Sequence, residues 1–173
     1  MPEEFYPIDV KNLTENPFYL MDDDWMLITA GSPENFNMMT ASWGTLGILW
    51  NKPVALCFIR PQRYTRKFAD ESSWFTLCFF TETYREALNI CGSKSGRHID
   101  KVKETGLSPV VTDSGNIIYR EARLVLECRK LYHDDFKPSQ FDVTSLIKRI
   151  YPTEDFHRFY IGEIITCLKN KFT

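Results

Sequence analysis

Most apolar residues of this sequence fall in short runs whose length is typical of β-strands. The first run covers residues 25–30 and is followed by turn-forming residues at 31–35, so we expect a hairpin whose second strand begins near Phe36. Similar runs cover residues 45–50, 54–59 and 74–80. Pro53 stands where a strand can begin but not continue, which predicts a tight reversal before it. The run 74–80 is almost wholly apolar, which predicts a strand that is buried on both faces or forms a barrel wall.

Two longer strands are expected later in the chain, at residues 117–131 and 157–167. In the first of them, apolar residues mostly alternate with charged or polar ones between residues 122 and 129. A period of two places the charged side chains on one face of the strand, so we expect that face to be in contact with water.

Helix signals occupy the segments between the strands. Thr65 is a plausible N-cap for a helix over residues 65–69. Thr83 and Glu86 fit the capping-box pattern, and Gly92 is a typical helix stop. Two further short helices are expected at residues 95–104 and 143–150, the second of them inside an excursion from the sheet over residues 132–155.

These elements together predict the fold class. Antiparallel strands with short peripheral helices at their crossings predict a mainly β or α+β fold whose sheet closes, or nearly closes, into a barrel. A doubly wound parallel sheet is not expected. With 173 residues and 20.3 kDa, the chain is long enough for one sizeable core and too short for two comfortable ones, so residues 1–173 are expected to form a single domain.

Composition and charge exclude several function classes. A net charge of -2 and a pI near 5.9 argue against a nucleic-acid partner, because such proteins usually carry a basic excess. The apolar runs are far shorter than the roughly 20 residues of a membrane-spanning helix, so no membrane association is expected. The first residues lack the order of a signal peptide, which favours a cytoplasmic location.

The five cysteines show no CxxC spacing and no neighbouring histidine at metal-ligand distance, so a zinc site is not expected. Cys91 precedes Gly92 beside polar residues, and we expect it to be partly exposed. The other four lie in strand-like apolar patterns and are expected to be small buried hydrophobic residues: Cys57, Cys78, Cys128 and Cys167.

Two polar segments carry candidate chemistry. Hydroxyl and guanidinium groups that could hold a phosphate occur within a short stretch, at Thr40, Ser42, Arg60, Arg63 and Thr65. The same residues could equally be ordinary strand threonines and serines, a helix cap and solvated arginines on a rim. A second segment, residues 91–97, lacks the order of a P-loop. It could present donors to a bound cofactor or be a linker between helices.

The order of these motifs along the chain resembles the flavoredoxin branch of the flavin reductase-like proteins, from about residue 23 to residue 167. The resemblance rests on the series Met39-Thr40-Ala41-Ser42-Trp43-Gly44, Trp50-Asn51-Lys52-Pro53, Arg60-Pro61-Gln62-Arg63-Tyr64-Thr65, Tyr84-Arg85, Cys91-Gly92-Ser93-Lys94-Ser95-Gly96-Arg97, Asp100-Lys101, Glu127-Cys128-Arg129 and His157-Arg158-Phe159-Tyr160-Ile161-Gly162-Glu163. It implies an FMN-binding split β-barrel with Greek-key antiparallel strands, usually a homodimer, whose flavin is held noncovalently near the subunit interface.

The resemblance also implies a set of site residues. The edge of the isoalloxazine ring would be lined by Met39, Thr40, Ala41, Ser42 and Trp43, and the phosphate surrounded by Arg60, Arg63, Tyr64 and Thr65. The far side would be closed by Ser93, Lys94, Ser95, Gly96 and Arg97. His157 stands where related reductases often have a histidine near the flavin and is expected to bind the substrate, although it could also be an ordinary histidine at a strand start.

Two classes of function follow from this resemblance. The first is an FMN-dependent NAD(P)H oxidoreductase of the flavin reductase type, in which hydride passes from nicotinamide to flavin and no side chain is assigned as catalytic. The second is an FMN-containing electron carrier or flavin-binding sensor that receives electrons from a redox protein. A third reading, a barrel without cofactor that binds a partner through its aromatic residues, also stays open.

Overall fold

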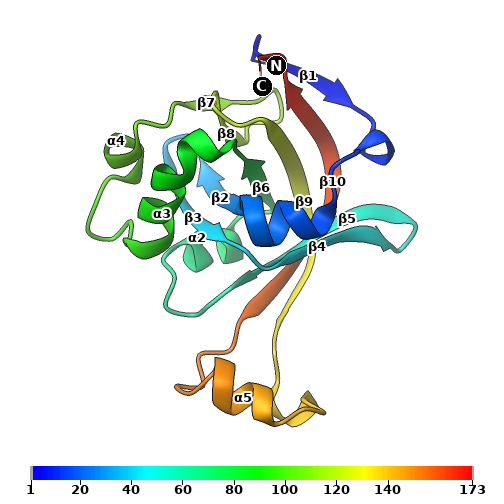
Figure 1. Ribbon diagram of the computed structural model, residues 1–173, viewed down its shortest axis with the longest axis vertical. Helices are drawn as coiled ribbons and strands as arrows, with labels where there is room; N and C mark the ends of the chain where they lie inside the picture. Colours follow the sequence, from blue (N-terminus) through cyan, green and yellow to red (C-terminus); the bar gives the residue numbers. More distant parts are fainter. Residues whose placement is uncertain (1, 173) are drawn as a thin grey trace.

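The computed structural model describes residues 2–172 and is built around a curved antiparallel sheet (Figure 1). The main sheet has eight strands, β1 (Phe5–Ile8), β2 (Met26–Ser32), β3 (Asn35–Ala41), β4 (Gly44–Leu49), β5 (Lys52–Ile59), β6 (Trp74–Phe79), β9 (Leu124–Asp135) and β10 (Arg158–Asn170). Their order is β3-β2-β6-β9-β10-β5-β4, with β1 paired to β10. Every pairing is antiparallel, which confirms the predicted class.

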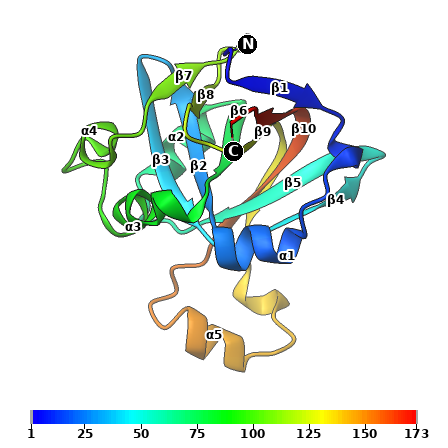
Figure 2. The same cartoon turned by 45° about the horizontal axis from the view of Figure 1, so that its top comes forward.

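Short helices and a small hairpin surround this sheet. The helices are α1 (Pro17–Tyr19), α2 (Thr65–Glu71), α3 (Arg85–Ser93), α4 (Lys101–Thr105) and α5 (Ser145–Ile150), and the hairpin pairs β7 (Pro109–Val111) with β8 (Ile117–Tyr119). Single turns of tighter or wider helix lie at Val10–Asn12, Leu20–Asp24, Glu82–Tyr84 and Pro138–Gln140. Helices α3 and α4 lie together on one side of the sheet (Figures 1 and 2). No described helix is long and apolar enough to cross a membrane.

The central strands are buried on both faces, as predicted for the run 74–80. In β6, Phe75 and Leu77 join the core inside the barrel, whereas Cys78 joins a second core that contains residues of α3 and β8. Full burial of one such large apolar side chain stabilises the fold by roughly 1.5–3 kcal/mol. Apolar contacts on both faces of β6 therefore hold the barrel and the helical layer together.

Several sequence expectations about element boundaries are wrong. The expected strand 117–131 is divided into β8 and β9, because the chain turns between them and the Ala122 N–H donates to the Tyr119 carbonyl at 3.0 Å. The expected helix 95–104 begins only at Lys101, since Asp100 is the N-cap and accepts from the Lys103 N–H at 3.2 Å. Ser95 instead accepts from the Arg97 N–H within the preceding turn.

The expected caps and one expected exposure are also wrong. Thr65 is the first residue of α2 and is buried with its hydroxyl turned to Asn37, so it does not cap the helix. Thr83 lies in a separate turn, and α3 begins after Tyr84 with no side-chain cap. Cys91 is completely buried rather than partly exposed, because its side of α3 packs into the second core.

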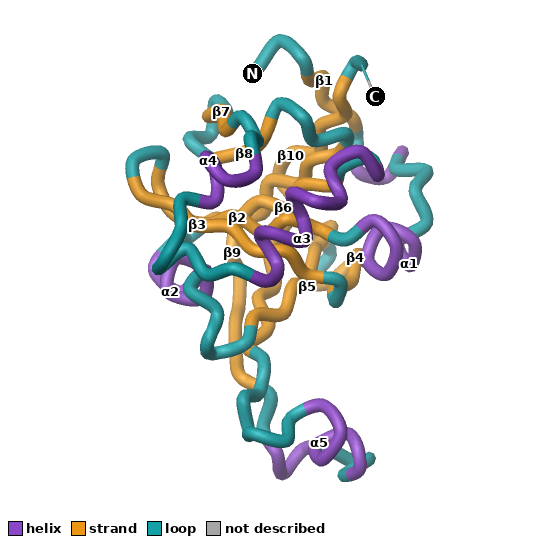
Figure 3. The backbone as a smooth tube through the Cα atoms, turned by 60° about the vertical axis from the view of Figure 1, so that its left-hand side comes forward, coloured by secondary structure: helices purple, strands orange, loops and turns teal. Residues whose placement is uncertain are grey.

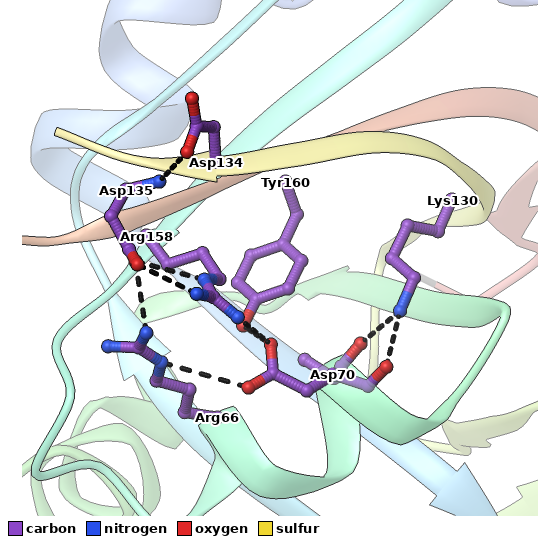
Figure 4. Close-up of polar contacts among 8 residues, drawn as sticks. Arg66, Asp70, Lys130, Asp134, Asp135, Arg158 and Tyr160 are labelled. Atoms are coloured by element: carbon purple, nitrogen blue, oxygen red, sulfur yellow. Dashed lines mark hydrogen bonds and ion pairs between the residues drawn. The ribbon is translucent and has the colours of Figure 1, made fainter.

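The excursion between β9 and β10 carries α5 and stands apart from the barrel (Figures 1 and 3). At its base the two strands pair Asp135 with Arg158, whose guanidinium makes two hydrogen bonds to the Asp135 carboxylate at 2.9 and 2.7 Å. Asp70 of α2 accepts from Arg158 at 3.1 Å and from the buried Tyr160 hydroxyl at 2.6 Å, and Arg66 joins the same network (Figure 4). These contacts fix α2 against the point where the excursion leaves the sheet.

Candidate functional site

A cleft of about 500 Å³ lies between the end of β3, the end of β5 and helix α3. Its lining residues are Trp25, Met39, Thr40, Ala41, Ser42, Trp43, Phe58, Arg60, Arg63, Leu88, Asn89, Gly92, Ser93 and His157. A smaller pocket of about 140 Å³ shares Arg63 and Ser93 with the cleft. The volume of the cleft is within the usual range for small-molecule sites.

The smaller pocket, called the polar pocket below, is lined by Asn37, Gln62, Arg63, Tyr64, Thr65, Ser93, Lys94, Ser95, Gly96 and Lys101. The cleft and the polar pocket thus bring together thirteen of the fourteen expected cofactor residues, and His157 as well. Arg97, the fourteenth, lies over the Tyr64 ring with its guanidinium carbon 4.6 Å from the ring centre and donates to the Gln62 carbonyl at 3.1 Å.

Arg63 stands where the cleft meets the polar pocket. Its guanidinium donates to the carbonyl oxygens of Gly92, at 2.5 Å, and Cys91, at 3.3 Å. These carbonyls belong to the C-terminal end of α3, where the helix dipole favours a positive charge. Burial lowers the pKa of Arg63, although an arginine remains charged. The two contacts hold the Arg63 side chain in a fixed position. A guanidinium carries five N–H donors, so Arg63 has further donors for a ligand.

Lys101 is a functional candidate that the sequence reasoning missed. The side chain is only 5% exposed, and its amine donates to the carbonyls of Met38, at 2.7 Å, and Cys91, at 2.8 Å. Burial and the nearby charge of Arg63 lower the pKa of Lys101 to about 8. Its position in the first turn of α4, where the helix dipole disfavours a cation, is the signal that could have identified it.

The backbone of the polar pocket comes unusually close to a side chain at Gly96. A Cβ atom at this position would collide with the Asn37 side-chain oxygen. Asn37 is buried and donates to the Thr65 hydroxyl at 2.8 Å, so it connects β3 to the start of α2. Glycine is favoured here because any other side chain would have to displace the Asn37 amide.

The hydroxyl of Thr40, expected to serve the cofactor, has a partner within the protein. It donates to the Leu88 carbonyl of α3 at 2.6 Å. The contact fixes β3 against α3. Because the hydroxyl hydrogen is used, the Thr40 oxygen can only accept a hydrogen bond from a ligand. The exposed Trp43 follows at the end of the same wall, with 46% of its surface accessible.

The opposite wall of the cleft is connected to the excursion. The His157 ring lies 5.1 Å from the Trp43 ring, and its Nδ1 atom is 2.8 Å from the Tyr151 hydroxyl. Arg60 forms an ion pair with Asp155 and donates to the Ile150 carbonyl at 3.1 Å. Burial and the charge of Arg60 lower the pKa of His157 to about 4, against an opposing effect of Asp155. The imidazole is therefore neutral at neutral pH.

Comparisons with known proteins give the family and confirm the fold. The family described as the flavin reductase like domain matches residues 19–171. None of the curated proteins matches the sequence.

Solved structures share this architecture at low sequence identity. An FMN-binding domain of flavin reductase-like enzymes from Shewanella baltica is 16% identical with a TM-score of 0.70, covering 96% of this chain and 77% of that one. A flavoredoxin from Methanosarcina acetivorans is 20% identical with a TM-score of 0.66, covering 95% and 76%. A Shewanella frigidimarina protein with a split barrel domain, assigned to the flavin reductases, is 16% identical with a TM-score of 0.67, covering 95% and 76%. The fold is thus the predicted split barrel, and the chain belongs to the flavin reductase-like family.

Proposed function

We propose that this protein binds FMN across the cleft and the polar pocket and acts as an NAD(P)H-dependent oxidoreductase of the flavin reductase type. The observation that carries the proposal is the junction of two unlike cavities at Arg63. FMN likewise combines a flat, largely apolar ring system with a terminal phosphate. Family membership supports the same ligand class.

The residues of the polar pocket fit a phosphate dianion. Arg63, Lys94 and Lys101 place three cationic side chains around a space of about 140 Å³, and Ser95 adds a hydroxyl. Charge-assisted hydrogen bonds to phosphate are about twice as strong as neutral ones. A buried lysine whose amine already donates to two carbonyls costs free energy unless an anion is near, so Lys101 also favours this ligand.

The residues of the cleft fit a planar ring. Met39, Phe58 and Leu88 give the cleft apolar surfaces, and the backbone of residues 40–43 borders it. When bound there, FMN would supply the acceptor for a hydride from a nicotinamide. The tasks left to the protein are to orient the two rings, limit the access of water and present hydrogen-bond donors at the ring edges. Trp43 and His157 lie at the wall of the cleft where the nicotinamide, as hydride donor, would enter.

The second candidate is an FMN-containing electron carrier, or a flavin-binding sensor, without direct NAD(P)H activity. The exposed indole of Trp43 favours it, because an exposed aromatic side chain beside the cleft could contact a redox protein. The deciding experiment is to identify the cofactor released from the purified protein and then to add NADH and NADPH anaerobically. Loss of the flavin absorbance supports the reductase. Absorbance that falls only with dithionite supports the carrier or sensor, and failure to bind FMN contradicts both.

We also propose a homodimer. Strand β4 is at the end of the sheet order and carries the exposed Ile48, and Trp50 follows it, with 68% and 55% of their surfaces accessible. An isologous contact would cover such an edge in both copies at once. Light scattering is expected to give twice the chain mass of 20.3 kDa, and a value equal to the chain mass at micromolar protein contradicts the dimer.

A further inference from the structure

His157 is held between two aromatic rings that come from different parts of the chain. The Trp43 ring follows β3, whereas the Tyr151 ring follows α5 in the excursion and lies 5.6 Å from the imidazole. Both His157 and Tyr151 are buried, with 8% and 5% of their surfaces accessible. The only hydrogen bond to the imidazole among the described residues joins Nδ1 to the Tyr151 hydroxyl at 2.8 Å.

The direction of this hydrogen bond follows from the surroundings of the Tyr151 oxygen. Burial raises the pKa of Tyr151, against the charge of Arg60, so the phenol keeps its proton. Among the described residues, Nδ1 of His157 is the only side-chain hydrogen-bond partner of the Tyr151 hydroxyl, so the buried phenol hydrogen is paired only when it points to Nδ1. A neutral imidazole that accepts at Nδ1 must carry its hydrogen on Nε2.

Burial, together with the charge of Arg60, keeps the imidazole neutral. The guanidinium of Arg60 lies over the Tyr151 ring, 5.3 Å from its centre, and disfavours a second positive charge beside it. Asp155 has the opposite effect, but its carboxylate is paired with Arg60 and accepts from Gln62 at 2.8 Å. Because these two charges are paired, their opposite effects on the pKa of His157 partly cancel.

We propose that Tyr151 is a positioning residue: it fixes His157 as the Nε2–H tautomer, so that the cleft offers a single neutral donor for a carbonyl oxygen of the ligand. Since His157 lines the cleft and Nδ1 is turned to Tyr151, the Nε2 edge is the one available to a ligand. Beside the flat Trp43 ring, the matching ligand is a planar heteroaromatic ring that bears an amide. This choice of ligand, the carboxamide of a nicotinamide, rests on the proposed function, whereas the tautomer does not.

The tautomer is tested in the protein without FMN. Nitrogen-15 NMR of the imidazoles is expected to show His157 neutral and protonated on Nε2 in the wild type, and a mixture of tautomers in Tyr151→Phe. Tyr132→Phe is the matched control, because it removes a phenol from β9, next to the excursion, whose hydroxyl bonds to Asp134 and not to His157. A wild-type ring protonated on Nδ1, or a Tyr151→Phe spectrum identical to wild type, overturns the proposal.

The consequence for the ligand is tested in the FMN-loaded protein with NADH and NADPH. Tyr151→Phe is expected to weaken the apparent affinity for the better donor roughly threefold to tenfold, the value of one hydrogen bond, and to leave FMN affinity unchanged. The reduced thionicotinamide analogue, whose sulfur is a weaker acceptor, should lose less affinity in this variant than the normal donor does. Equal losses for both donors contradict the role of the carbonyl. If neither NADH nor NADPH reduces the wild type, the reductase function fails, and the NMR result still decides the role of Tyr151.

Discussion

The two walls of the cleft are built in different ways. On the wall that leads to the polar pocket, Arg63 and Lys101 donate to backbone carbonyls of α3 and β3, which belong to the packed body of the protein. On the other wall, Arg60 and His157 have partners in the excursion, at Asp155 and Tyr151. One wall is therefore fixed by the barrel and its helices, and the other by a segment outside the barrel.

This difference separates two tasks of a cofactor site. Groups tied to a packed core keep their geometry whether or not a ligand is present, which suits the binding of an anion. The excursion is instead held together by contacts among its own aromatic rings, at Phe136, Phe141, Tyr151 and Phe156. Segments with few contacts to the main core open at lower free energy, so the wall that would meet the second substrate is the more adjustable one.

The largest effect is expected from breaking the fixed wall at Arg63. Arg63→Ala should weaken the binding of FMN by about 1.5–3 kcal/mol, because a charged hydrogen bond to the phosphate is lost. It should affect the binding of riboflavin much less. Fluorescence titration with both ligands measures the difference. Arg149→Ala, which removes an exposed arginine from α5, is the control. Equal losses for FMN and riboflavin would place Arg63 away from the phosphate.

A somewhat smaller effect is expected from Gly96→Ala, which tests the fixed wall without removing a charge. The added methyl group must displace Asn37 from its hydrogen bond with Thr65, at a cost of about 1–3 kcal/mol in the free energy of unfolding. Denaturant unfolding and FMN titration should both show the loss. Gly47→Ala adds the same group where no atom lies within 4 Å and should change little. An unchanged Gly96→Ala protein would mean that the loop can move away freely.

The adjustable wall can be tested through pH. The pKa of His157 is about 4 in the folded protein, lower than the ordinary value of 6.5, so between these values the unfolded chain binds a proton that the folded chain excludes. Its contribution to stability is present above pH 6.5 and is lost as the pH falls toward 4, on the order of 3 kcal/mol.

Denaturant unfolding at several pH values measures this dependence. His157→Gln should reduce the slope of the free energy of unfolding against pH between pH 6.5 and 4. His98→Gln, at an exposed histidine, should not reduce it. A slope that is the same in wild type and His157→Gln would mean that other groups control the acid response.

The smallest effect on the whole fold is expected from Phe141→Ala. Phe141 contacts Phe136, Tyr151 and Phe156, so its loss should lower the free energy of opening of the excursion by about 1 kcal/mol. Limited proteolysis between residues 136 and 156 should become faster, while the barrel unfolds at nearly the same temperature. Phe172→Ala, at a residue that is 81% exposed, is the control. A large fall in the melting temperature would show that the excursion and the barrel unfold together.

Much of the site could be predicted from the sequence because its residues follow ordered motifs. Met39 to Trp43 lie at the end of β3, and Arg63 to Thr65 lie between the end of β5 and the start of α2; the structure places both groups around connected cavities. Lys101 was not assigned to the site, although the motif series includes it, because its place in the first turn of a helix is only a weak local signal of burial. Its burial follows from the packing of α4 and α3 against β3, which are separate in sequence.

By itself, the sequence determined the strand periods, the antiparallel class, the family and most of the residues that line the cleft and the polar pocket, because these depend on local patterns and on motif order. Tertiary structure decided which polar groups already have a partner. Thr40, Thr65 and Arg60 have the chemistry of cofactor ligands, but their hydrogen bonds to Leu88, Asn37 and Asp155 join segments far apart in the chain. Such pairings depend on the three-dimensional approach of the segments, and a linear pattern does not contain that information.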